Sequence, residues 1–281
     1  MSEYKVRPMT RKDLELAVRW AAEEGWNPGL ADVGTFYETD PEGYWCGVLD
    51  GEMIASISAV KYGAYFGFVG FYIVKPEFRG KGYGLELWNR AMESLAGRNV
   101  GLDGVVAQQD NYKKSGFQLA YNNLRYEGVT NGEASIREGI GAITKDQLEA
   151  ILSYDGPFFP VDRQSFLRNW LQQDGSTALA SWRDGNLLGY GVIRPCRNGY
   201  KIGPLVADTT EIAENLFLGL QSSVRSGEPF YLDFPEPNEA ALMLALKHDM
   251  KKVFETARMY TTDFPALPLA RLYGITSFEL G

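Results

Sequence analysis

The stretch FYIVKPEFRGKGYG, residues 71–84, decides how this chain is interpreted. Its first four residues are aromatic or β-branched and predict a strand. Three glycines follow within five residues, and the apolar spacing of residues 82–95 then predicts a helix. The face that this helix is expected to bury consists of Leu85, Trp88, Met92 and Leu95.

A glycine-rich turn between a strand and a helix predicts an anion site. Glycine lets the backbone approach a ligand closely, and the free N–H groups and dipole of a helix start attract negative charge. Arg79 and Lys81 add positive charge, so a pyrophosphate is the expected ligand. Two familiar phosphate loops do not fit. A Walker A loop needs Ser or Thr after Gly-Lys, where this chain has Gly82, and a dinucleotide fingerprint needs G-x-G-x-x-G.

A second motif narrows the interpretation. The R-G-x-G-x-G arrangement at 79–84 resembles the acetyl-CoA loop of the GNAT superfamily of N-acetyltransferases, and YKKSGF at 112–117 resembles the Y-x-x-x-G-F segment after that family's fifth strand. The helix that usually precedes this tyrosine is shortened here, so Asn111 stands in for the family's cofactor-binding asparagine. The resemblance implies that acetyl-CoA is held by Tyr72, Ile73, Val74, Arg79, Gly80, Lys81, Gly82, Tyr83, Gly84, Leu85 and Asn111.

The resemblance also implies catalytic roles. Tyr112 is expected to protonate the CoA thiolate, the alternative being a tyrosine that only packs, and the backbone near Ile73 and Val74 is expected to bind the thioester oxyanion. No general base stands out, and the candidates are Glu24, Asp32 and Asp103.

The family's first loop lines its acceptor pocket. Glu24, Trp26 and Asn27 occupy this loop and are the expected substrate contacts, although Glu23 and Glu24 are equally compatible with a solvated helix end.

The remaining pattern predicts an internal repeat. Expected helices and strands occupy residues 10–21, 44–49, 53–60, 67–74 and 102–107, with a closing hairpin from 117–121 and 124–127. A turn-rich boundary is expected at 128–133. Thr144 and Gln147 then form a capping box that is expected to open a short helix, and a second helix is expected at 162–172. The plan of the first half repeats in strands at 178–182, 187–193 and 200–206, a helix at 212–220 and a strand at 230–234.

Two domains follow from this repeat. The prediction is an α+β fold with a GNAT domain at 1–128 that binds acetyl-CoA and a degenerate GNAT-like domain at 129–281 that shapes the acceptor site. Each is expected to be a mixed, mostly antiparallel twisted sheet flanked by helices. The second half lacks the glycine loop after 203–208 but keeps Asn238 where the family places its asparagine.

Composition limits the function classes. With 45% hydrophobic and 23% charged residues the chain reads as globular, and a net charge of -8 argues against nucleic acid and suits a cationic amine. Two cysteines and one histidine exclude a disulfide framework and a multi-histidine metal site. No apolar run reaches a membrane span and no secretory signal is evident, so a cytoplasmic protein is expected, with a homodimer possible.

The predicted function is an acetyl-CoA-dependent N-acetyltransferase without a metal, acting on a small-molecule or peptide amine by direct attack. The alternative is a CoA-binding sensor or scaffold that has lost catalysis. A donor longer than acetyl is also compatible with the sequence.

Overall fold

The computed structural model describes residues 3–130 and 139–281. The predicted boundary at 128–133 falls partly outside these residues. The first half contains β1 (Tyr4–Pro8), α1 (Arg11–Glu23), α2 (Asp32–Thr39), β2 (Tyr44–Leu49), β3 (Glu52–Tyr62), β4 (Phe66–Val74), α3 (Tyr83–Ser94), β5 (Asn99–Val105), α4 (Gln109–Lys114) and β6 (Gln118–Val129). The second half contains β7 (Ile140–Ala142), α5 (Leu148–Asp155), α6 (Gln164–Trp170), β8 (Thr177–Arg183), β9 (Asn186–Pro195), β10 (Tyr200–Ala207), α7 (Thr210–Ser222), β11 (Pro229–Pro235), α8 (Glu239–Lys247), β12 (Lys251–Tyr260) and β13 (Leu272–Gly274).

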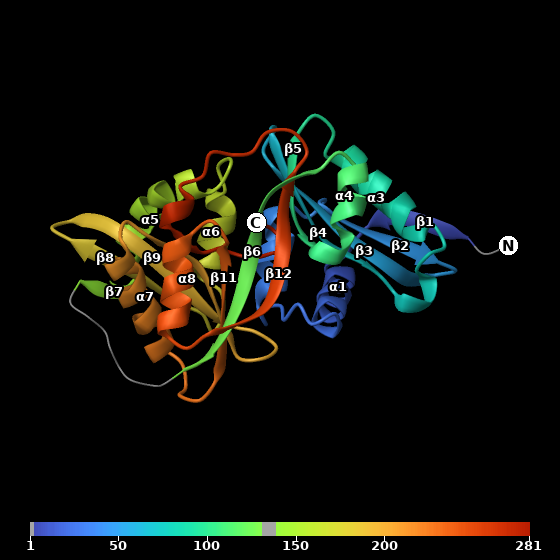
Figure 1. Cartoon of the computed structure of the whole chain (residues 1–281). Helices are drawn as coiled ribbons and strands as arrows, with labels where there is room; N and C mark the ends of the chain where they lie inside the picture. Colours follow the sequence, from blue (N-terminus) through green and yellow to red (C-terminus); the bar gives the residue numbers. More distant parts are fainter. Residues whose placement is uncertain (1–2, 131–138) are drawn as a thin grey trace.

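The two halves share one 13-stranded sheet. Its order is β1-β2-β3-β4-β5-β12-β6-β11-β10-β9-β8-β7, with β13 paired to β10. Strand β12, from the end of the chain, lies between β5 and β6, and β6 in turn pairs with β11 of the second half (Figure 1). The halves therefore exchange strands at the centre of the sheet.

Local signals in the sequence account for many of these elements. Thr10 and Asp13 form the capping box that starts α1. The Asp50-Gly51 and Asp184-Gly185 turns each have two positive φ angles, as a tight type I′ hairpin requires, and they join β2 to β3 and β8 to β9. The strand pairs β4–β5 and β10–β11 are parallel, whereas every other pair in the described sheet is antiparallel. The repeat and the fold class predicted from the sequence are confirmed.

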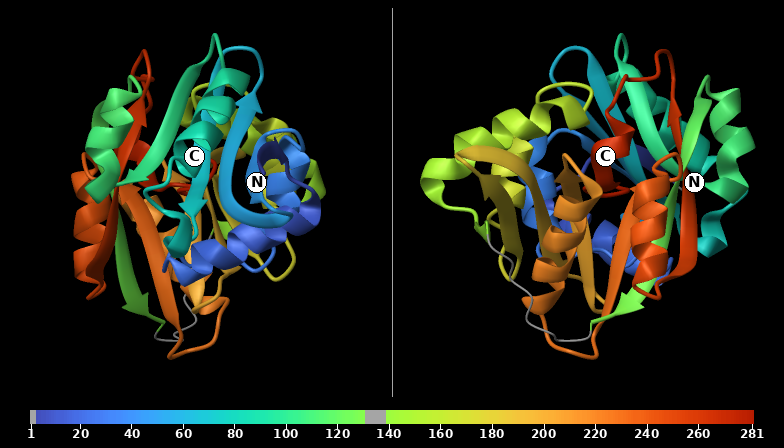
Figure 2. Two further views of the ribbon diagram at one scale, coloured as in Figure 1. Left: turned by 90° about the vertical axis from the view of Figure 1, so that its right-hand side faces the viewer. Right: turned by 60° about the vertical axis from the view of Figure 1, so that its left-hand side comes forward.

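Helices cover both faces of the sheet. On one face α3 covers the first half and α7 covers the second, each over its own apolar cluster. On the opposite face a single core joins α1 and α2 to α5 and α6, and it includes Phe36 and Trp170, whose rings stack at 6.0 Å. The C-terminal end of the chain lies in the middle of the molecule (Figure 2), and residues 272–281 are all buried.

Two sequence predictions were wrong. Residues 117–127 do not form a hairpin, because β6 is one continuous strand with β12 on one edge and β11 on the other. Leu85 is exposed rather than buried, with an exposed fraction of 63%, and α3 buries Leu87 and Ala91 together with the predicted Trp88.

Candidate active site

Strands β4 and β5 diverge halfway along their length. They pair only from Phe66 to Val69. Immediately beyond, Phe71 has a φ of 49°, and two residues of β4 stand opposite one residue of β3. This bulge turns the end of β4 away from β5. The result is a split in the sheet, bordered by Tyr72 and Val74.

The register of β4 determines which backbone groups face this split. Lys75 donates its N–H to Ile54 of β3 at 3.0 Å, and Ile73 lies opposite Ser56. Hydrogen-bonding direction alternates along an antiparallel strand, so the amide of Ile73 also faces β3, while that of Val74 faces the split. The carbonyl of Val74 lies on that side and accepts from Arg79 Nε at 2.7 Å. The geometry thus favours Val74 over Ile73 as the amide donor for an oxyanion.

The glycine turn leads from the split to the start of α3. Gly82 caps the helix with a φ of 90°, a left-handed conformation that suits glycine. Gly84 packs where a Cβ would lie 2.7 Å from Tyr72 Oη, so a larger residue would displace that ring. The first helical bond runs from the Glu86 amide to the Gly82 carbonyl, leaving the amides of Tyr83, Gly84 and Leu85 without an intrahelical acceptor.

The other predicted loop residues are placed as follows. Gly80 has a φ of 74° with open space around it, and Lys81 is exposed, its ammonium 5.5 Å from the Phe78 ring. Arg79 is exposed and pairs with Glu24 at the end of α1. Asn111 is exposed on α4, where it donates to Gln108 Oε1 at 2.7 Å, so its amide is engaged within its own turn.

Tyr112 lies beside the split, on α4. Its ring packs against Trp88 at 5.7 Å, and Trp88 also contacts Tyr72 at 5.2 Å. A Cβ at Gly104 of β5 would lie 2.3 Å from the Tyr112 ring, so the ring can occupy this position only because residue 104 has no side chain. Burial, with a smaller contribution from Tyr72, raises the pKa of Tyr112 to about 12. The phenol is therefore protonated at neutral pH.

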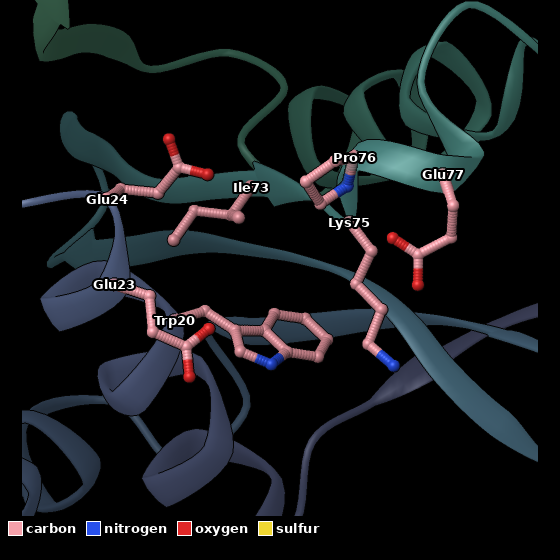
Figure 3. Close-up of a pocket in the computed structure, with 7 residues that line it drawn as sticks. All are labelled: Trp20, Glu23, Glu24, Ile73, Lys75, Pro76 and Glu77. Atoms are coloured by element: carbon pink, nitrogen blue, oxygen red, sulfur yellow. The ribbon is translucent and has the colours of Figure 1, made fainter.

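A small open pocket lies on the opposite face of β4. Its volume is about 190 Å³, and it is lined by Trp20, Glu23, Glu24, Ile73, Lys75, Pro76 and Glu77 (Figure 3). Lys75 is paired with Glu52 outside the lining and Glu24 is paired with Arg79, so the carboxylates of Glu23 and Glu77 give the pocket a negative character. Of the predicted substrate contacts, Glu24 is the one at this pocket. Trp20 and Lys75 were missed because a helix pattern and a strand end carry no sequence signal for pocket lining.

Trp26 and Asn27 lie where the two halves meet, Trp26 between Arg125 of β6 and Lys201 of β10. The carbonyl of Trp26 accepts from Arg125 at 2.9 Å and from Lys201 at 3.1 Å. Asn27 accepts from the Asn198 amide at 2.8 Å and donates to the Asn198 carbonyl at 3.0 Å. The structure therefore engages the Asn27 side chain at the seam between the halves.

Two of the three candidate bases are held in buried ion pairs. Asp32 accepts from Arg194 and from the Gly29 amide. Asp103 accepts from both Arg258 and Asn123. Each carboxylate is thus neutralised by an arginine, which leaves Glu24 as the exposed member of the three candidates.

The second half has an equivalent split, but its own chain fills it. Strands β10 and β11 pair only from Tyr200 to Ile202. Beyond this point β13 pairs with β10, and Ile275 donates to the Asp233 carbonyl of β11 at 2.7 Å. Thr209 caps α7, and Asn238 is buried as the cap of α8, donating to the Leu272 carbonyl. These contacts leave the second half without the open split of the first.

Comparison with known proteins identifies the class of protein to which this glycine loop and split sheet belong. Residues 11–117 match the model of the Acetyltransferase (GNAT) family, and residues 151–274 match an Acetyltransferase (GNAT) domain model. Holothin acyltransferase of Pseudoalteromonas sp. (strain SANK 73390) is 31% identical over 98% of this chain and 94% of its own. The chain belongs to the GNAT family as a tandem-GNAT acyltransferase.

Solved structures agree in fold. A putative acetyltransferase from Pyrococcus horikoshii superposes with a TM-score of 0.84 at 23% identity, covering 99% of this chain and 96% of the other. A tandem GNAT protein from the clavulanic acid biosynthesis pathway superposes with a TM-score of 0.64 at 13% identity, covering 92% and 98%. Within the described residues, no cluster of His, Cys, Asp and Glu could hold a metal ion. The helices of the described chain include none long and apolar enough to cross a membrane.

Proposed function

We propose that this protein transfers an acetyl group from acetyl-CoA to a primary amine by direct attack in a ternary complex. The observation that carries the proposal is the open split beside Val74, which leads to the unpaired amides at the start of α3. The strand edge offers hydrogen bonds to an extended pantetheine arm, and the helix start offers donors to a pyrophosphate. The filled split of the second half supports one cofactor site per chain, in the first half.

Except for Ile73, whose amide faces β3, and Arg79, which pairs with Glu24, the predicted cofactor contacts have a part in this proposal. The backbone of Tyr72 and Val74 borders the arm, with Ile73 on the opposite face of β4. The loop from Gly80 to Leu85 surrounds the pyrophosphate. Asn111 lies on α4 near the same end of the split as Tyr112, and it reaches the arm only by releasing Gln108.

The acceptor must lose a proton before it attacks. An alkylamine of pKa about 10.4 is neutral about once in 2,500 molecules at pH 7, a penalty of roughly 4.6 kcal/mol. In the reaction the nitrogen bonds to the acetyl carbon, the C–S bond breaks, and the thiolate takes a proton from the Tyr112 phenol. The nitrogen gives up two protons in all: the ammonium proton leaves to a base or to water before the attack, and the second, lost as the amide forms, restores the Tyr112 phenol.

Burial has two effects on the Tyr112 step. A pKa of about 12 keeps the proton on the phenol at neutral pH. This pKa is higher than that of an ordinary thiol, about 8.5, so proton transfer from the phenol to the thiolate is uphill. The same desolvated surroundings raise the pKa of a thiolate leaving group, which narrows the difference. Tyr112 therefore donates a hydrogen bond as charge builds on sulfur and completes the proton transfer late.

The acceptor class follows from charge. The pocket around Glu23 and Glu77, in which Glu24 is already paired with Arg79, favours a cationic amine before deprotonation. The name of the relative holothin acyltransferase supports a small-molecule acceptor. A catalytically silent CoA sensor is the second candidate, and the same experiment separates the two.

That experiment measures CoA release from acetyl-CoA with a panel of primary amines, comparing wild type with Tyr112→Phe. We expect wild-type turnover, about 10²-fold lower kcat in the variant as for loss of a general acid, and an unchanged Kd for acetyl-CoA. Tyr65→Phe is the matched control, because Tyr65 is 79% exposed. Equal kcat in Tyr112→Phe and wild type would contradict the role of the phenol. Binding of acetyl-CoA without turnover of any amine would favour the sensor.

A further inference from the structure

Buried ion pairs line the seam between the two halves. Four arginines with at most 6% exposure each contact one aspartate, in the pairs Arg125–Asp233, Arg163–Asp155, Arg194–Asp32 and Arg258–Asp103. In each pair both guanidinium and carboxylate are desolvated, and each charge has its counter-charge. The four positive and four negative charges therefore neutralise one another.

Two further charged side chains in the same seam have no ion-pair partner among the described residues. Lys201 and Glu279 are each 3% exposed, and neither is in an ion pair with any described residue. The Lys201 ammonium has three donors and one acceptor, the Trp26 carbonyl at 3.1 Å. Both carboxylate oxygens of Glu279 are without a hydrogen-bond partner among the described residues. A buried carboxylate in this condition is unfavourable in a folded protein and calls for a functional explanation.

Their position relates them to the proposed site. The Glu279 carbonyl oxygen would lie 2.2 Å from a Cβ at Gly70, so its backbone crosses β4 one residue before the bulge at Phe71. Glu279 therefore lies at the base of the split, on the face opposite Tyr72. The Glu279 carboxylate is among the acidic groups that raise the pKa of Arg125, and at Lys201 it opposes the lowering of the pKa by burial and by Arg125, which places the carboxylate near both cations.

We propose that Glu279 and Lys201 form an acceptor subsite for a small primary amine that also carries a carbonyl oxygen. This inference rests on the proposed acetyl transfer. The Glu279 carboxylate accepts from the amine, and the two free donors of the Lys201 ammonium bind the carbonyl oxygen of the same molecule.

This assignment also supplies the base that the sequence did not reveal. The ammonium proton of the acceptor passes to the Glu279 carboxylate, and the neutral nitrogen then bonds to the acetyl carbon. The C–S bond breaks and the thiolate receives the proton of Tyr112. As the amide forms, the nitrogen loses its second proton, which passes through water to the Tyr112 phenolate, and solvent exchange removes the first proton from Glu279.

The test uses the full chain, acetyl-CoA and two probes that differ in one group, phenylalaninamide and phenethylamine. We expect wild type to prefer the amide by about tenfold or more in kcat/KM, the value of a hydrogen bond to a charged donor. Lys201→Met should remove the preference by lowering kcat/KM for the amide to the value for phenethylamine. Lys252→Met is the matched control, because Lys252 is an exposed lysine paired with Glu255.

Glu279→Gln separates a site role from a structural one. We expect kcat to fall about 10²-fold for both amines with the Kd for acetyl-CoA unchanged, since glutamine keeps the size of the side chain but cannot take the proton. A kcat within twofold of wild type, or a raised Kd for acetyl-CoA that accompanies the loss of kcat, would overturn the subsite. Wild type that binds acetyl-CoA but does not prefer the amide would overturn it too, whereas wild type that binds no acetyl-CoA would instead refute the proposed function.

Discussion

Lys201 makes stability depend on pH in a predictable direction. Burial, followed by the charge of Arg125, lowers its pKa from 10.5 to about 8. Between these values the unfolded chain holds a proton that the folded chain has released, so folding becomes more favourable as pH rises. The gain between pH 7 and pH 9.5 amounts to about 2 kcal/mol, from roughly 1.5 pKa units at 1.36 kcal/mol each.

The assay is urea unfolding of wild type and Lys201→Met at pH 7 and pH 9.5. Other groups that titrate in this interval, the cysteines included, are present in both proteins and cancel in the difference. We expect the free energy of unfolding of wild type to rise relative to the variant by about 2 kcal/mol over the interval. A difference that stays constant, or one that falls with pH, would refute the reasoning, because it would mean that the Lys201 ammonium has an ordinary or raised pKa in the folded state.

Two further predictions concern packing and charge. Gly104→Ala should lower kcat with little change in the Kd for acetyl-CoA, because its Cβ would lie 2.3 Å from the Tyr112 ring. Gly141→Ala, which has open space, is its control, and equal kinetics in the two variants would contradict the account. Asp233→Asn should cost about 3–5 kcal/mol in urea unfolding, because it leaves the Arg125 guanidinium buried and unpaired. The exposed Asp110→Asn should stay within about 0.5 kcal/mol, and a similar small cost for Asp233→Asn would show that the pair is solvated.

Local signals carried much of the fold. The Asp-Gly turns, the Thr10 capping box and the alternation of apolar residues fix hairpins and helices within a few residues of chain, so sequence reasoning found them. The exchange of β6 and β12 has no such signal. It depends on pairings such as that of Arg258 with Asp103, which lie 155 residues apart in the sequence. The sequence of β6, one continuous strand with a neighbour on each edge, resembles that of two short strands.

The candidate site divides in the same way. The glycine loop and Tyr112 lie within motifs whose spacing is visible, and the structure brings both to the split. Lys201 and Glu279 lie 78 positions apart in segments without a motif. They differ from the other buried charged side chains of the seam in having no ion-pair partner among the described residues. That property exists only once the four arginine–aspartate pairs are assembled around them.

The central claim is one acetyl-CoA site, at the split of the first half. Its most direct test is a calorimetric titration of wild type and Gly82→Trp with acetyl-CoA, with Gly51→Trp as control at an exposed turn of similar φ. The account predicts one site per chain in wild type and in the control, and no binding in Gly82→Trp when all three proteins are folded. Two sites per chain, or undiminished binding in Gly82→Trp, would contradict it.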